Sequence, residues 1–173
     1  MLDRRAFAFS LAALSLVALA SPAVAADDDP AAPITAIYER AGSGGHGGSF
    51  VWVKKSDRAR WFSRDLAARW NKAAARTAKG DQQPLGFDPI SNSQDPGVRA
   101  PRVSLKRRDA NTATVAASFV GWGEAPQRIT VIYDMVWEKS LVRSRSRWAI
   151  DDIRGTMDGK DWSVRALLAN WKG

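Results

Sequence analysis

The sequence predicts an α+β domain in which helices pack on one antiparallel sheet. Apolar residues recur at helical spacing in the first part of the chain, and from residue 102 onward they alternate with polar ones. The chain has 173 residues, 45% hydrophobic and 25% charged, which is typical of a single globular domain. We therefore expect N-terminal helices, a four-stranded antiparallel meander and a C-terminal helix, all within one domain over 33–173.

The first 25 residues are expected to be a signal peptide rather than part of this fold. Arg4 and Arg5 precede an apolar run over 6–20, and residues 21–25 end in the A-x-A pattern of a cleavage site. The run is shorter than the roughly 20 residues that a membrane span needs. We expect cleavage after Ala25, a periplasmic or secreted product and no membrane-spanning segment after processing. The arginine pair also fits a twin-arginine signal, so the Sec and twin-arginine routes both stay open.

The first helix is predicted over 33–41. An acidic segment at 26–32, rich in alanine and proline, is interpreted as a flexible lead-in. Pro33 suits the first turn of a helix, because its missing N–H has no partner there in any case. The glycine-rich segment 42–48 ends this helix and is predicted to be a loop.

A second helix is predicted to begin after Ser63 and to extend to residue 78. The Ser63 hydroxyl can cap it, and Asp65 would lie in the first turn, where the helix dipole favours a carboxylate. The preceding segment 50–55 fits either a short strand or a helical turn. Segment 83–101, with four prolines, is predicted to be a long ordered loop.

Alternation at every second position predicts the strands, and polar segments between them predict the turns. The two tight turns are expected at 109–111 and 139–145, with a break at 121–126. The predicted strands cover 102–108, 112–122, 128–138 and 147–154, and the last helix covers 161–171.

Four segments resemble, in order, the signature blocks of a bacterial exported family known as domain of unknown function 3828. They are residues 61–66 (WFSRDL), 88–95 (DPISNSQD), 148–153 (WAIDDI) and 162–168 (WSVRALL). That family is similar to the nuclear transport factor 2-like, or cystatin-like, cone. The resemblance implies helices packed in a strongly curved antiparallel sheet over about 34–171, and no particular activity. Family members often end with a cysteine after the last helix, which this chain lacks.

Composition excludes several classes of site. The chain has no cysteine, which excludes disulfides, thiolate metal sites and cysteine nucleophiles. Its only histidine, His46, excludes sites that need two imidazoles, including the usual zinc hydrolase sets. His46 lies among glycines, but no phosphate-loop spacing follows it. We expect neither a metal nor a cofactor.

The candidate catalytic residues are three carboxylates, Asp88, Asp95 and Asp152. The cone resemblance implies a pocket, in which related cones hold a carboxylate as a general base. Asp152 is predicted to share its strand face with Trp148 and Ile150, where apolar neighbours would raise its pKa. The alternative is structural: Asp88 and Asp95 would stabilise turns before prolines, and Asp152 would pair with an arginine of its own strand.

Positive charge is concentrated at the two tight turns of the meander. The net charge is +8, and basic residues cluster at 106–108 and 143–147. In a meander, the turn between the first two strands and the turn between the third and fourth strands lie at the same end of the sheet. We therefore expect the two clusters to form a shared basic rim. The candidate binding residues are Arg107, Arg108, Arg143 and Arg145, together with Trp122 as an exposed aromatic. The alternative is that these turns are merely solvated.

These features favour an exported, non-enzymatic binding domain with a basic rim. Its expected partners are a small apolar ligand or an envelope protein, and an anionic envelope surface; export makes nucleic acid an unsuitable partner. Two alternatives remain open. One is an acid–base enzyme that uses Asp152 with Asp88 or Asp95 on a small molecule, and the other is an envelope immunity or inhibitor protein.

Overall fold

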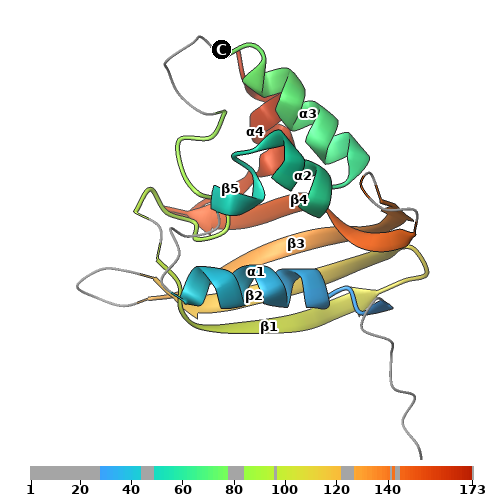
Figure 1. Cartoon of the computed structure of the whole chain (residues 1–173). Helices are drawn as coiled ribbons and strands as arrows, with labels where there is room; N and C mark the ends of the chain where they lie inside the picture. Colours follow the sequence, from blue (N-terminus) through green and yellow to red (C-terminus); the bar gives the residue numbers. More distant parts are fainter. Residues whose placement is uncertain are drawn as a thin grey trace, which may run out of the picture.

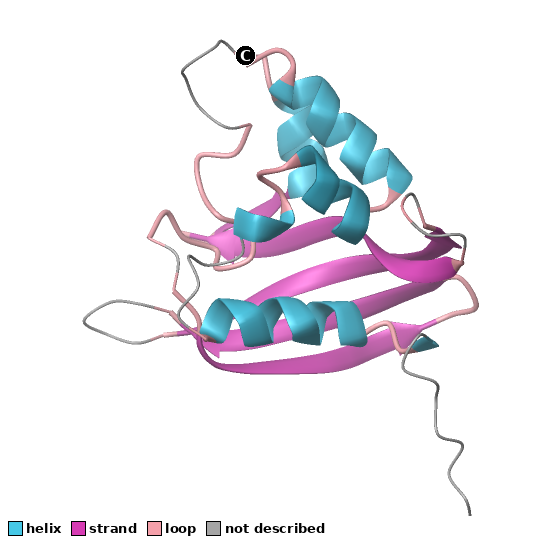
Figure 2. Ribbon diagram, viewed as in Figure 1, coloured by secondary structure: helices cyan, strands magenta, loops and turns pink. Residues whose placement is uncertain are grey.

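The computed structural model describes residues 28–43, 49–77, 84–95, 97–121, 127–140, 142 and 145–172. Within these segments the chain forms four α-helices and a five-stranded antiparallel sheet, which confirms the α+β prediction (Figures 1 and 2). The signal peptide, Trp122 and Arg143 lie outside the described residues.

The sheet is a sequential meander, with strand order β1-β2-β3-β4-β5. Its strands are β1 (Arg99–Arg108), β2 (Thr112–Val120), β3 (Arg128–Lys139), β4 (Ser146–Met157) and β5 (Lys160–Ser163). The predicted order of the first four strands is confirmed, and β5 is a fifth strand that the sequence reading missed. Asp158 and Gly159 form its turn with φ values of 52° and 73°, the conformation of a two-residue hairpin that Asp-Gly favours.

The helices are α1 (Ala32–Gly42), α2 (Lys55–Trp61), α3 (Arg64–Ala74) and α4 (Val164–Asn170). Three of them lie where the sequence predicts them, but α3 ends at Ala74 instead of residue 78 and α4 begins at Val164 instead of residue 161. One 3₁₀ turn, η2 (Ser49–Val51), lies between α1 and α2. The Ser63 hydroxyl accepts the N–H of Leu66 at 3.0 Å, so the predicted cap of α3 is confirmed. The whole of α2 is an addition to the prediction.

One hydrophobic core joins the helices to the sheet, with α1 along β1 and β2 and the other helices over β4 (Figure 1). Its centre is filled by large side chains that are fully buried: Tyr38, Phe62, Trp70, Phe119 and Tyr133. Tyr38 contacts both Phe119 and Tyr133, with ring centroids 5.4 and 6.1 Å apart. The space between α1 and the sheet is therefore occupied by the protein's own aromatic rings.

A bulge in β4 corrects the predicted placement of Asp152. Ile150 pairs with Met135, but the next pairs are Asp152 with Asp134 and Ile153 with Tyr133, so β4 carries one extra residue. The extra residue reverses the alternation, as β-bulges do. Ile153, rather than Asp152, therefore continues the core face of Ile150, and Asp152 does not share the face of the apolar side chains.

Candidate functional site

The Asp152 carboxylate lies at the beginning of α4. It is 8% exposed and accepts three hydrogen bonds, from the N–H groups of Ile153 at 2.8 Å and Arg165 at 3.0 Å and from the Ser163 hydroxyl at 2.6 Å. The Ser163 hydroxyl in turn accepts the N–H of Ala166 at 3.3 Å. Asp152 thus satisfies the N-terminal backbone of a helix, a common task for a carboxylate at this position.

Asp88 and Asp95 lie in the loop that precedes β1. Asp88 is buried and accepts the N–H of Ile90 at 3.1 Å, the Ser91 hydroxyl at 3.0 Å and the indole N–H of Trp52 at 3.2 Å. Asp95 is exposed, and its backbone N–H and carbonyl both bond the Ser93 hydroxyl. The structure does not bring the three candidate carboxylates into one site, and each takes part in local backbone or loop structure.

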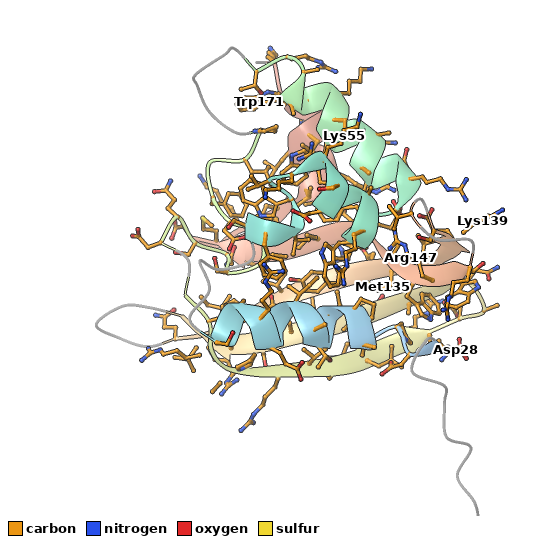
Figure 3. The ribbon with its side chains drawn as sticks, viewed as in Figure 1. Asp28, Lys55, Met135, Lys139, Arg147 and Trp171 are labelled. Atoms are coloured by element: carbon orange, nitrogen blue, oxygen red, sulfur yellow. The ribbon has the colours of Figure 1, made fainter. Side chains whose placement is uncertain are left out.

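The two basic turns lie at one end of the sheet, as the meander argument predicts. Asn111, in the β1–β2 turn, accepts the N–H of Trp137 through its carbonyl at 2.9 Å, close to where β3 leads into the next turn. Figure 3 shows Lys139, Arg147 and Asp28 all toward that end of the sheet. We keep the name basic rim for residues 106–108 and 143–147, of which 143 and 144 are outside the described residues.

The rim arginines do not all face the same side of the sheet. Strand alternation puts Arg107 and Arg108 on opposite faces, and the β1 bulge between Leu105 and Arg107 makes Arg108, which pairs with the buried Ala113, the one on the helix side. Arg107 pairs with Asp109 at 3.0 Å. Arg108 lies over the ring of Trp148, 5.5 Å from its centroid, on the side that the helices cover. Only Arg108 of this pair therefore approaches the helix side of the rim.

A cavity of about 240 Å³ lies on that side, where the end of α2, the start of α1 and the β3–β4 turn meet. We call it the rim cavity. Trp61 and Trp148 provide aromatic surface, and Arg60 and Arg145 provide positive charge. Val142, which is 58% exposed, adds apolar surface beside them. Its lining is Asp29, Ala32, Pro33, Arg60, Trp61, Ser140, Val142, Arg145, Ser146, Arg147 and Trp148. This mixture of cations and aromatic rings suits a ligand that is both anionic and partly apolar.

Arg147 lines the rim cavity and holds the end of α2 in place. Its guanidinium donates to the carbonyls of Ala59 at 3.1 Å and Phe62 at 2.8 Å, and more weakly to those of Trp61 and Trp148. Burial lowers the pKa of Arg147, an effect that the nearby Glu138 carboxylate opposes. A cation at the C-terminal carbonyls of a helix is favourable, because those carbonyls carry the negative end of the dipole. The two Nη atoms of Arg147 are thus occupied by protein acceptors, whereas its buried Nε has no hydrogen-bond partner among the described residues.

Most of the rim cavity was not foreseen from the sequence. The prediction named Arg145 from this lining, but it missed Arg60 and Trp61, because both belong to the unpredicted α2. The seven-residue segment KSDRARW shows no apolar repeat that would have indicated a helix. Trp61 and Trp148 did occur in the segments that resemble the exported family, which was the available signal.

No protein-family model, curated protein or solved structure matches this chain. None of the helices in the described segments has the length and apolar character needed to cross a membrane. The same described residues contain no group of three or more histidine, aspartate or glutamate side chains suited to a metal ion.

Proposed function

We propose that this chain is exported and acts, after removal of its signal peptide, as a non-enzymatic binding domain that engages an anionic partner at the basic rim. The rim cavity is the observation that carries the proposal, because it combines Arg60 and Arg145 with the rings of Trp61 and Trp148. Aromatic rings supply apolar contact area, and arginines recognise carboxylates or phosphates through paired hydrogen bonds. The cavity is of a size for part of a ligand, such as a headgroup or one or two side chains.

The fold supports assignment to the cystatin-like cone and to the exported family that the sequence resembles. N-terminal helices, a sequential antiparallel meander and a short C-terminal helix occur in the expected order. The support comes from this order of elements together with the four resembling segments.

The absence of catalytic activity is proposed from the engagement of the candidate carboxylates. A general base needs a carboxylate that can reach a substrate proton. Asp152 accepts three hydrogen bonds at the start of α4, and Asp88, within the 84–95 loop, accepts three. A base at either position would first have to give up bonds that the fold uses.

The test is salt-dependent binding of the mature protein to two probes, immobilised poly-L-glutamate and vesicles containing phosphatidylglycerol. A rim variant replaces four arginines by serine, and a control variant removes four exposed cations elsewhere. The rim variant changes Arg107, Arg108, Arg143 and Arg145, and the control changes Lys54, Lys55, Lys72 and Lys172.

We expect the rim variant to lose most of its binding at low salt and the control to keep it. The difference should shrink at high salt, because charges further apart than the Debye length of about 8 Å at physiological salt are screened. Equal salt dependence in the two variants would mean that the rim serves only solubility. A mature protein that binds neither probe at any salt concentration would refute the proposed function.

A further inference from the structure

Asp28, in the acidic lead-in of the chain, already contacts the rim. The Asp28 carboxylate pairs with Arg108 at 2.7 Å, and the Asp28 backbone carbonyl accepts the indole N–H of Trp148 at 3.0 Å. The next residue, Asp29, lines the rim cavity, and its carboxylate accepts the N–H of Ala31 at 2.9 Å. Asp28, labelled in Figure 3, and Asp29 thus lie where an anionic partner would approach.

We propose, on the basis of the proposed function, that the rim binds an acidic peptide segment in the way it binds Asp28, and that the lead-in competes with this partner. Arg108 binds the carboxylate and the Trp148 indole N–H binds the backbone carbonyl, and a single acidic residue supplies both groups. The site therefore recognises the side chain and the backbone of one acidic residue.

The rim cavity accounts for what lies next to that acidic residue. It begins at Asp29, directly after the Asp28 contacts, and continues to Trp61 and the exposed Val142. An apolar side chain of the partner fits between these surfaces, and Arg60 is available at the same cavity for a second carboxylate. The partner segment is thus acidic with an adjacent apolar residue, and such charge complementarity mainly provides specificity and rapid association.

The contact with the lead-in is weak enough to be displaced. The side chains of Asp28 and Arg108 are 53% and 33% exposed, and ion pairs of this kind contribute little to stability in water. Removing the Asp28 charge should therefore free Arg108 without unfolding the domain. We expect affinity for an acidic peptide to rise by about two- to fivefold, the range that an exposed ion pair allows.

The experiment uses the mature chain and a labelled, acetylated peptide with the sequence of residues 26–32, ADDDPAA, followed by fluorescence anisotropy. The variants are Asp28→Asn, the matched charge control Glu39→Gln on the exposed side of α1, and Arg108→Gln. A peptide with its three aspartates changed to asparagine controls for charge, and thermal melting of each variant controls for folding.

We expect Asp28→Asn to bind the peptide about two- to fivefold more tightly, Glu39→Gln to match the unmodified protein, and Arg108→Gln to bind more weakly. Equal affinities for Asp28→Asn and Glu39→Gln would overturn the competition. Binding to phosphatidylglycerol vesicles without binding to the peptide would overturn the peptide partner while leaving the proposed function intact. If no variant binds peptide, poly-L-glutamate or vesicles, both proposals fail.

Discussion

The two tyrosines of the chain form a buried pair whose ionisation should limit stability at high pH. Tyr38 and Tyr133 are fully buried, their hydroxyls are 2.9 Å apart, and Tyr38 donates to the carbonyl of Ile90 at 2.7 Å. Burial raises the pKa of both phenols well above the ordinary value. In the unfolded chain they ionise near the ordinary tyrosine pKa of about 10. The folded protein therefore retains two protons that the unfolded chain releases.

The sign and size of the effect follow from this difference in bound protons. Below pH ~10 both states are protonated, and the stabilisation of the neutral phenols is fully present. Above pH ~10 the unfolded state binds fewer protons than the native state, so the free energy of unfolding falls by about 1.4 kcal/mol per pH unit for each tyrosine. The pair should therefore lose about 2.7 kcal/mol between pH ~9 and pH ~11.

Urea unfolding at these two pH values measures the loss, and tyrosinate absorbance measures the ionisation. Since Tyr38 and Tyr133 are the only tyrosines, we expect no tyrosinate signal from the folded protein at the higher pH and a signal from both on unfolding. The double variant Tyr38→Phe/Tyr133→Phe separates this effect from lysine titration. An equal loss of stability in the double variant, or tyrosinate absorbance from folded protein, would refute the reasoning.

Three further substitutions test other contacts by urea unfolding. Asp152→Ala should destabilise the fold by about 2–3 kcal/mol and Asp152→Asn by less, because the amide oxygen can still accept; an unchanged midpoint for Asp152→Ala would contradict its helix-capping role. Arg58→Met should cost about 2–4 kcal/mol, because the guanidinium holds the Asn71 side chain through two bonds of 2.9 and 3.0 Å; Arg58→Lys should recover only part of this. Gly155→Ala should cost about 1–3 kcal/mol, because its Cβ would lie 2.6 Å from the Trp162 ring. In a Trp162→Leu background, Gly155→Ala should lower the free energy of unfolding by less.

The sequence predicted the elements whose signals are local and periodic. The alternation in β2 and β3 and the cap at Ser63 are such signals, and the structure has them where expected. Helix α2 has no such signal, since its seven residues show no apolar repeat. A helix of this length is also too short to be stable in isolation. It is held by tertiary contacts instead: Arg58 is buried against α3, and Arg147 binds the last carbonyls. Neither contact is visible in the sequence pattern of α2.

Strand β5 was missed for a different reason. Its turn residues, Asp158 and Gly159, are a strong hairpin signal, but the four residues that follow are mostly polar and show no apolar alternation. As an edge strand it buries little surface, so only the turn identifies it. A hairpin predicted at Asp158 and Gly159 would place residues 160–163 in a strand and would start the last helix at Val164, where α4 begins.

The placement of Asp152 could not be read from its own strand, because WAIDDI alternates equally well in either phase after Ile150. The phase is decided by β3, where consecutive residues Asp134 and Met135 pair with Asp152 and Ile150. The extra residue lets Ile153 enter the core and leaves Asp152 at the start of α4. Burial of Ile153 and the bonds between Asp152 and the start of α4 both favour this register. A register with Asp152 on the core face would lose both contributions.

The same effect of a bulge decides which charges act together at the rim. The meander order predicts that the two basic turns share an end, and this prediction is confirmed, but order alone does not say on which face a side chain lies. The bulge in β1 gives the helix side of the rim Arg108 and leaves Arg107 paired with Asp109 on the other face. Arg145 and Arg147 line the rim cavity from the second basic turn and β4, and α2 adds Arg60 from a distant part of the chain. The proposed binding surface therefore depends on tertiary packing between α2 and β4, and a count of basic residues at the turns describes its location but not its composition.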